Sequence, residues 1–240
     1  YQLRRTRARG DETPVELTNP SLLRPFEKIL ALFGTPLYGE VEPTPLLAVG
    51  FLLLFGMMCG DVGQGLVLLG LGLGLRRFSR FREEGLLLAE VGGAAALFGV
   101  LFGSVFGLET LLPAIWFSPF QNIPLLMGAA LAVGIVLIFS GLLLRIANLW
   151  AQVPLLDLLT DRFGIAGALF YGGSVGTVLL VWLDRIPGVS LLWLLLPLGA
   201  TFFHPLVARQ EAEANLALLL AEGVIEVMET VLGYLVNTFS

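Results

Sequence analysis

Long apolar stretches separated by short charged segments make up most of the chain after residue 44. Seven stretches stand out, at residues 45–60, 61–76, 86–107, 124–146, 164–183, 189–207 and 216–239. A membrane-spanning helix needs about 20 mainly apolar residues, and several of these stretches approach or exceed that length. The pattern therefore predicts an all-α integral membrane protein, a multi-span helical bundle with about seven transmembrane helices over residues 45–240.

Residues 1–44 have a different character, because they are polar and charged. A short amphipathic helix is predicted from Ser21 to Phe33, and its apolar side carries five residues: Leu22, Phe26, Ile29, Leu30 and Phe33. We expect this segment to be cytoplasmic and to follow a soluble N-terminal domain, so that the sequence is an internal piece of a longer protein.

The first two apolar stretches run from Pro45 to Leu75 without a lysine or arginine and contain one acid, Asp61. A single helix of about thirty residues would be roughly 45 Å long, well beyond a hydrocarbon core of about 30 Å. Arginines flank both ends, and basic residues collect on the cytoplasmic side of membranes. Both ends should therefore be cytoplasmic, which predicts a hairpin of two short helices that divides between Gly56 and Asp61.

The same charge rule predicts the orientation of the whole chain. Only Arg185 lies in a connection expected on the far side of the membrane. The connections expected on the cytoplasmic side carry Arg76, Arg77, Arg80, Arg82, Arg145, Arg162 and Arg209. This bias predicts a cytoplasmic N-terminus.

Composition narrows the classes of function. The chain is 56% hydrophobic and 14% charged, with a mean hydropathy of +0.86 and a net charge of −5. There is no basic groove or zinc-ligand spacing, which argues against a nucleic-acid partner. The single cysteine, Cys59, excludes an internal disulfide and a cysteine-rich metal site. We find no arrangement of residues for covalent catalysis, a metal or a cofactor, so the chain is not expected to be an enzyme by itself.

Small residues recur at intervals of four in several places, including Gly172 and Gly176. Gly56 is followed by Gly60, and Gly99 by Gly103 and Gly107. Glycines at this spacing allow transmembrane helices to approach closely, so we expect these five to pack helices together.

Asp61 has two interpretations that the residues alone leave open. An acid at membrane depth is expensive and is by default a functional candidate, here a proton-accepting carboxylate that lines a water-filled cavity. Alternatively, Asp61 caps the turn of the predicted hairpin by accepting hydrogen bonds from backbone N–H groups.

Three glutamates form the second candidate site. Glu222, Glu226 and Glu229 are spaced by four and three residues, which places them on one helical face over about 10 Å. Such a stripe suits a hydrated half-channel for protons. It is also typical of a solvated first turn before a helix submerges, and Glu211 and Glu213 just upstream favour that alternative.

Three further residues carry a weaker signal. Glu90 and Glu109 lie near the ends of an apolar stretch, and His204 precedes Pro205 at the cytoplasmic end of another. A lone histidine in that position is more typical of an interface or packing residue than of a proton relay.

Two segments resemble a known family. Glu40-Val41-Glu42-Pro43-Thr44-Pro45 is similar to a Glu-x-Asp-Pro-Thr pattern, and Phe55 to Gly65, with Gly60-Asp61-Val62-Gly63-Gln64-Gly65, is similar to Met-Phe-Gly-Asp-x-Gly-x-Gly. Both patterns belong to the membrane domain of subunit a of V-type and A-type rotary ATPases, which is called subunit I in prokaryotes. The resemblance extends over nearly the whole chain.

The resemblance implies a stator subunit whose aqueous half-channels pass protons to and from a rotating proteolipid c-ring. It also implies peripheral-stalk and central-stalk subunits as partners, besides the lipid bilayer. Asp61 and Glu229 match acidic positions associated with the half-channels. The family pattern continues as Tyr-Leu-Arg, so its essential arginine is expected beyond Ser240. The preference for arginine over lysine suggests a bacterial source and hence a prokaryotic plasma membrane.

Two other functions are compatible with an apolar bundle that contains carboxylates. One is a self-contained ion-coupled secondary transporter, although the internal repeats common in transporters are not evident. The other is a structural membrane anchor, with its acids at the membrane interfaces.

Overall fold

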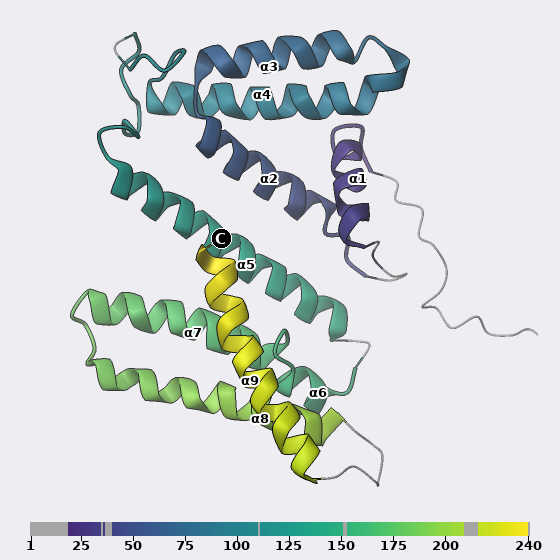
Figure 1. The fold of residues 1–240 in the computed structure, drawn as a ribbon, viewed down its shortest axis with the longest axis vertical. Helices are drawn as coiled ribbons and strands as arrows, with labels where there is room; N and C mark the ends of the chain where they lie inside the picture. The colour runs from purple at the N-terminus through teal and green to yellow at the C-terminus, as the bar shows by residue number, and fades with distance from the viewer. Residues whose placement is uncertain are drawn as a thin grey trace, which may run out of the picture. The chain divides into compact units, whose positions relative to one another are not determined.

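The computed structural model describes residues 19–34, 36, 40–109, 111–150, 153–208 and 216–239. The predicted segment 1–18 and the residues Arg209, Glu211 and Glu213 lie outside this part of the chain. The helices of the described part are α1 (Arg24–Phe33), α2 (Thr44–Cys59), α3 (Val62–Leu75), α4 (Arg82–Phe102), α5 (Ile123–Leu149), α6 (Leu155–Thr160), α7 (Ile165–Trp182), α8 (Leu195–Ala208) and α9 (Leu216–Phe239) (Figure 1). Two short 3-10 segments, η2 (Ser79–Phe81) and η3 (Gly188–Leu194), precede α4 and α8.

Within the described residues, four helical segments are long and apolar enough to cross a membrane: Ser79–Phe102, Ile123–Leu149, Leu155–Trp182 and Ser190–Val207. The helices α2 and α3 are apolar but shorter. The all-α membrane fold is confirmed, whereas the count of about seven spans is not supported. The difference arises because α2 and α3 are short and because α9 carries three glutamates.

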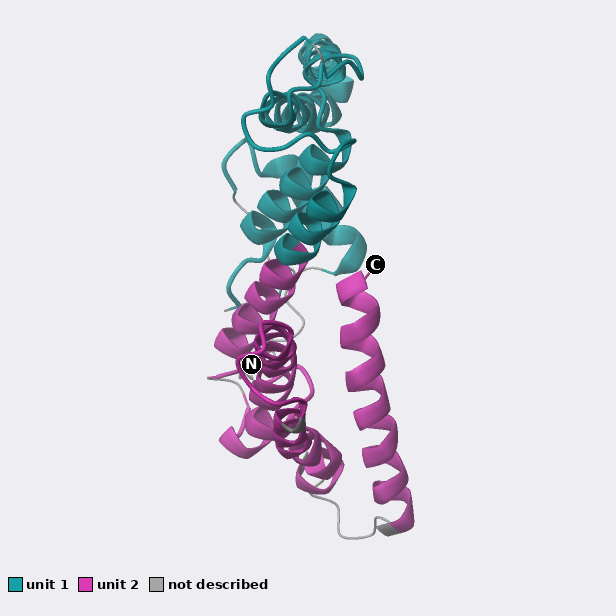
Figure 2. Cartoon of the chain, turned by 90° about the vertical axis from the view of Figure 1, so that its left-hand side faces the viewer, with its two compact units in different colours: residues 1–133 teal, residues 134–240 magenta. Residues whose placement is uncertain are grey.

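The chain divides into two compact units, residues 1–133 and residues 134–240 (Figure 2). In the first unit, Met57, Phe98, Phe102 and Phe117 form a buried hydrophobic core. In the second, Leu142, Ala168, Tyr171 and Tyr234 are buried together. Because α5 runs from residue 123 to 149, its first turns pack in the first core and its later turns in the second.

The break between the first two apolar helices lies at Gly60 and Asp61, where the sequence places it. The predicted hairpin is not formed, however, because α3 packs lengthwise along α4 rather than along α2. Figure 1 shows α3 and α4 side by side, with α2 leaving in another direction.

Glycines at seven-residue spacing explain why α3 pairs with α4. Gly65 and Gly72 lie on α3, opposite α4 glycines at positions 85 and 92. A Cβ atom added to Gly72 would meet the backbone of Ala89, and one added to Gly92 would meet the backbone of Leu69. The two helix backbones are therefore in direct contact, which only residues without a side chain allow.

The five glycines predicted to pack helices fall into two groups. At Gly56 and Gly60 an added Cβ would collide with the rings of Phe98 and Phe102, and at Gly99 with the backbone at Asp61 and Val62. Close packing is therefore observed at these three positions.

Gly103 and Gly107 are a correction to the sequence analysis. The helix α4 ends at Phe102, so these two glycines lie in the following connection and not on a helix that continues to residue 107. Their φ angles are +72° and +78°, in the left-handed region that favours glycine. Their four-residue spacing reflects a helix end followed by a turn.

The amphipathic helix α1 is present as predicted. Phe26 and Leu30 are buried, but Leu22 and Phe33 are exposed, so its predicted apolar side is only partly covered. Lys28 of α1 forms ion pairs with Glu83 and Glu84 at the start of α4, which joins the two helices.

Candidate functional site

The three predicted glutamates lie on α9 and line one cavity in the second unit. The volume of this cavity is about 720 Å³. Its polar lining consists of Arg145, Asp161, Arg162, His204, Glu222, Glu226 and Glu229. The helical spacing therefore identified one wall of a common site.

The opposite wall comes from three other elements. Arg145 lies on α5, Asp161 and Arg162 lie in the short connection between α6 and α7, and His204 lies on α8. The ring of Phe163 fixes the position of the two guanidinium groups, which lie 5.0 Å (Arg145) and 4.9 Å (Arg162) from its centroid.

Each of two α9 glutamates faces a basic side chain. Glu226 lies 2.8 Å from Nδ1 of His204, and both side chains are largely buried, at 16% and 22% exposed. Glu229 forms an ion pair with Arg162, and its side chain is 55% exposed. The two glutamates thus differ in partner and in exposure, although they lie within one turn of helix.

The connection that carries Arg162 is anchored from both sides. Asp161 accepts a hydrogen bond from Nη2 of Arg145 at 3.4 Å, and the Tyr234 hydroxyl donates to the Arg162 carbonyl oxygen at 2.7 Å. Tyr234 lies on α9, one turn beyond Thr230. The helix that carries the glutamates therefore also positions the arginine opposite them.

This arrangement can bind and pass on protons. Four carboxylates and two arginines line the cavity, so its lining attracts cations. An imidazole is the side chain best suited to exchange protons near neutral pH, and here it contacts a carboxylate directly. Within the described residues there is no group of three His, Cys, Asp or Glu side chains that could hold a metal ion.

Sequence reasoning missed half of this site. The sequence analysis uses Arg145 and Arg162 only to predict the orientation of the chain in the membrane. It interprets His204 as an interface or packing residue. One signal was available: Asp161 and Arg162 are adjacent charges between two apolar stretches, next to an aromatic residue.

Asp61 lies in the first unit and has a different environment. Its side chain begins α3 as the N-cap and accepts a hydrogen bond from Gln64 N at 2.9 Å. Three more donors come from the connection after α4: Ser104 Oγ at 2.8 Å, Phe106 N at 2.9 Å and Gly107 N at 2.7 Å. The residue is 4% exposed.

The donors reach Asp61 because the backbone turns sharply after α4. Gly103, Phe106 and Gly107 all have positive φ angles, and Phe106 adopts +51° despite its large side chain. Successive N–H groups in such a turn form a concave anion-binding surface, which the Asp61 carboxylate occupies. This geometry is that of a capping residue; a place for Asp61 in a proton path stays a prediction.

The two weaker acidic candidates lie apart from both sites. Both carboxylate oxygens of Glu90 are buried on α4 and have no hydrogen-bond partner among the described residues. Glu109 accepts long hydrogen bonds of 3.4 Å from Phe120 N and the Gln121 side chain, in the exposed connection before α5.

Comparisons with known proteins give a consistent result. The chain is 30% identical over 200 residues to "A-type ATP synthase subunit I" of Thermococcus kodakarensis, and 29% identical over 190 residues to the protein of that name from Archaeoglobus fulgidus. It is 36% identical over 108 residues to "V-type ATP synthase subunit I 2" of Treponema pallidum. These matches cover 76%, 66% and 43% of this chain, respectively.

The chain spans only 24–28% of the length of these relatives. No protein-family model matches it. The relatives nevertheless all carry the name of the same subunit, and the predicted resemblance is confirmed. In sequence, the chain corresponds to part of subunit I, the subunit a equivalent, of A-type and V-type rotary ATPases.

Proposed function

We propose that this chain is part of the stator membrane subunit of a rotary ATPase or synthase, and that the cavity beside α9 is an aqueous half-channel for protons. The observation that carries the proposal is one cavity that gathers Glu222, Glu226, Glu229, His204 and Arg162 from two helices and a connection. The relatives are named as subunits of ATP synthases, and a proton half-channel is a part that such a complex needs.

Glu229 is the best candidate for the transfer step to a proteolipid ring. It lies where the polar cavity adjoins an apolar stripe of α9, formed by Ile225, Met228, Leu232 and Val236. All four of these side chains are exposed. An exposed apolar helix face next to a carboxylate suits a lipid-embedded partner helix that itself carries a carboxylate.

Arg162 and His204 have distinct roles in this proposal. The guanidinium of Arg162 forms an ion pair with Glu229 and holds its side chain at the edge of the cavity. The imidazole of His204 exchanges protons with Glu226 further along the cavity. Neither step makes or breaks a bond other than one to hydrogen, and ATP chemistry belongs to other subunits of the complex.

The orientation and remaining partners follow from the same proposal. Arg76, Arg77, Arg80 and Arg82 would face the cytoplasm of a prokaryotic cell, with the peripheral-stalk and central-stalk subunits on that side. Asp61 is a further candidate for the proton path, in the first unit, besides its role as the N-cap of α3.

The test is ATP-driven proton pumping by the intact complex in membrane vesicles. Glu229→Gln should reduce pumping by about tenfold or more, since removal of a proton-transfer group commonly costs that much or more. Glu109→Gln is the matched control, because it makes the same chemical change in an exposed connection outside the cavity. Assembly is checked by co-purification of the other subunits.

Two results would overturn the proposal. In the first, Glu229→Gln and Glu226→Gln both pump at the wild-type rate in an assembled complex. In the second, the purified protein that contains this chain moves protons alone in liposomes, which would favour a self-contained secondary transporter.

A further inference from the structure

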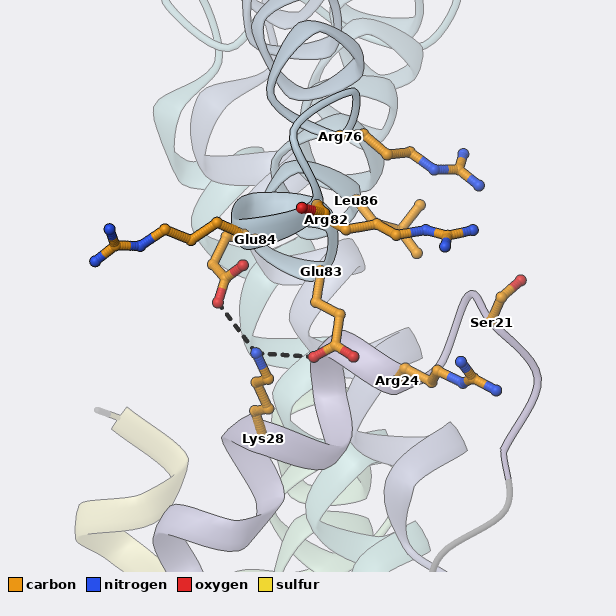
Figure 3. Close-up of a pocket in the computed structure, with 10 residues that line it drawn as sticks. Ser21, Arg24, Lys28, Arg76, Arg82, Glu83, Glu84 and Leu86 are labelled. Carbon is orange, nitrogen blue, oxygen red and sulfur yellow. Dashed lines mark hydrogen bonds and ion pairs between the residues drawn. The ribbon is translucent and has the colours of Figure 1, made fainter.

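A second cavity lies in the first unit, between α1 and the connection that joins α3 to α4. Its volume is about 360 Å³. Its polar lining consists of Ser21, Arg24, Lys28, Arg76, Ser79, Arg80, Arg82, Glu83 and Glu84 (Figure 3). We call it the basic cavity, because five of these side chains are basic and two are acidic.

The two acids of the basic cavity both form an ion pair with the same residue. Nζ of Lys28 lies 2.8 Å from Glu83 and 3.0 Å from Glu84. Hydrogen bonds to these two carboxylates raise the pKa of Lys28 above its ordinary value, so its ammonium group stays charged. Lys28 therefore serves to hold α1 against α4, and the arginines are left to interact with something else.

Among the described residues, three arginines of the basic cavity form no ion pair, although Arg76 also interacts electrostatically with Glu90 of α4. The three are Arg24, Arg76 and Arg82. Figure 3 shows these three side chains extending to the same side of the cavity, together with Ser21 and away from Lys28. They come from two helices and a connection, so the fold brings together three charges that repel one another.

Unpaired guanidinium groups that converge from separate elements are suited to bind a phosphate. A guanidinium group donates two parallel hydrogen bonds to phosphate oxygens, and several of them can surround one phosphate. An anion in the basic cavity would also relieve the repulsion between Arg24, Arg76 and Arg82.

The surroundings of the basic cavity favour a lipid as the source of the phosphate. Leu22 and Phe33 of the α1 segment are 61% and 83% exposed, and Phe78 beside η2 is 64% exposed. An amphipathic helix with exposed apolar residues beside basic ones is typical of a membrane interface. These three side chains do not line the basic cavity, but they lie on the segments that form it. A soluble phosphate ion would not contact them, whereas the acyl chains of a phospholipid would cover them.

We propose that the basic cavity binds the headgroup phosphate of an anionic membrane phospholipid, held by Arg24, Arg76 and Arg82. The bound lipid would join α1 to the α3–α4 connection and position α1 at the membrane surface. This site is separate from the proton cavity in the second unit, and the proposal stands whether or not that cavity conducts protons.

The experiment uses the full-length protein that contains this chain, reconstituted in phosphatidylcholine nanodiscs. Spin-labelled phosphatidylglycerol or spin-labelled phosphatidylcholine is added, and the immobilised fraction of each is measured by electron paramagnetic resonance. The wild-type protein should immobilise phosphatidylglycerol preferentially. Arg76→Gln should reduce this preference about tenfold, the effect expected when charge-assisted hydrogen bonds to the phosphate are lost.

Arg77→Gln is the matched control, because Arg77 is the neighbouring residue but does not line the basic cavity. It removes the same charge and should change the preference by less than about twofold, since the diffuse field alone is screened over about 10 Å in salt. Equal losses in the two variants would show a non-specific field and overturn the proposal. Arg24→Gln, on exposed α1, repeats the test on a different element and decides the outcome if Arg76→Gln does not fold.

A further arm distinguishes a lipid from a soluble anion. Inorganic phosphate is added to the protein in pure phosphatidylcholine nanodiscs, and the thermal midpoint of unfolding is measured. No shift is expected if the site needs the acyl chains. A rise of the midpoint that Arg76→Gln abolishes would assign the basic cavity to a soluble phosphate and overturn the lipid assignment.

Discussion

Each of the two units contains an acid within an apolar segment, and these acids differ in exposure and in hydrogen-bond partners. In the first unit, Asp61 is 4% exposed and accepts four hydrogen bonds, three of them from backbone N–H groups. In the second unit, Glu229 is 55% exposed at its side chain, faces one arginine and lines an open cavity.

The contrast shows that depth in an apolar segment does not by itself identify a proton-carrying acid. Backbone donors cannot leave, so they hold an aspartate in its ionised form and in one place. An arginine or histidine side chain can move, and a cavity admits water to replace it. The set of hydrogen-bond partners therefore separates a structural carboxylate from one that can exchange protons.

The largest expected effect comes from Asp61→Asn, which tests the structural half of this contrast. An amide turns its NH2 group toward donors that need an acceptor, so the free energy of unfolding should fall by on the order of 3 kcal/mol. The measurement is thermal unfolding in detergent, combined with limited proteolysis of the connection at residues 103–109. An Asp61→Asn protein with the wild-type midpoint and blocked proton pumping would instead move Asp61 into the proton path.

A smaller effect is expected at the contact between α3 and α4, which makes the first unit rigid. Gly72→Ala places a Cβ against the backbone of α4 and should destabilise the protein by about 1–3 kcal/mol. Gly70→Ala is the control on the same helix, because nothing lies within 4 Å of its Cβ position. It should be neutral or stabilising by up to about 1 kcal/mol. Equal thermal midpoints for the two variants would contradict the direct contact of the helix backbones.

His204→Gln addresses the second unit, where stability and function should separate. The amide keeps a polar group near Glu226 but does not titrate, so the cost in unfolding free energy should be no more than about 1 kcal/mol. Proton pumping by the assembled complex should fall, because glutamine cannot take up and release a proton as an imidazole does. Pumping at the wild-type rate would leave His204 with a packing role only.

The smallest effect is expected for the coupling between Arg162 and Glu229. Their side chains are 32% and 55% exposed, so a double-mutant cycle with Arg162→Gln and Glu229→Gln should give about 0.2–1 kcal/mol in stability. A coupling energy well above that range would mean that the pair is desolvated. Glu229 would then resemble the buried Asp61 more than its exposure indicates.

Much of the fold could be predicted from local patterns. All seven apolar stretches contain helices, and the break at Asp61 follows from the length of a membrane span and the arginines on both sides. The end of α4 could not be predicted in the same way. In the sequence, Gly103 is compatible both with a helix-packing motif and with a left-handed residue that ends a helix. The turn that ends the helix here is completed by contacts with Asp61 and Ala114, which are distant in the sequence or follow the turn.

The pairing of α3 with α4 did leave a signal in the sequence. Gly65 and Gly72, like Gly85 and Gly92, recur every seven residues, which keeps them on one side of a helix. A search for glycines spaced by four residues does not find this seven-residue pattern. The spacing that a pair of helices uses depends on their crossing geometry, which a single sequence does not specify.

Only one wall of the proton cavity follows from periodicity. The glutamates of α9 share a helical face, but Arg162 lies 67 residues away from Glu229 along the chain, and His204 lies 22 residues from Glu226. No local rule relates positions so far apart. Their association depends on how α6, α7, α8 and α9 pack, and so it becomes visible only in the folded chain.

The capped turn at Asp61 also has a consequence for synthesis. Its donors in the connection after α4 lie 43 to 46 residues further along the chain, so the ribosome makes the acid well before them. At about 5–20 residues per second, the delay is roughly 2 to 9 seconds. During that interval only Gln64, of the four donors, is available, and the nascent chain must carry an incompletely satisfied aspartate between two apolar helices. We therefore expect the first unit to reach its folded arrangement only after this turn has been synthesised and has bound Asp61.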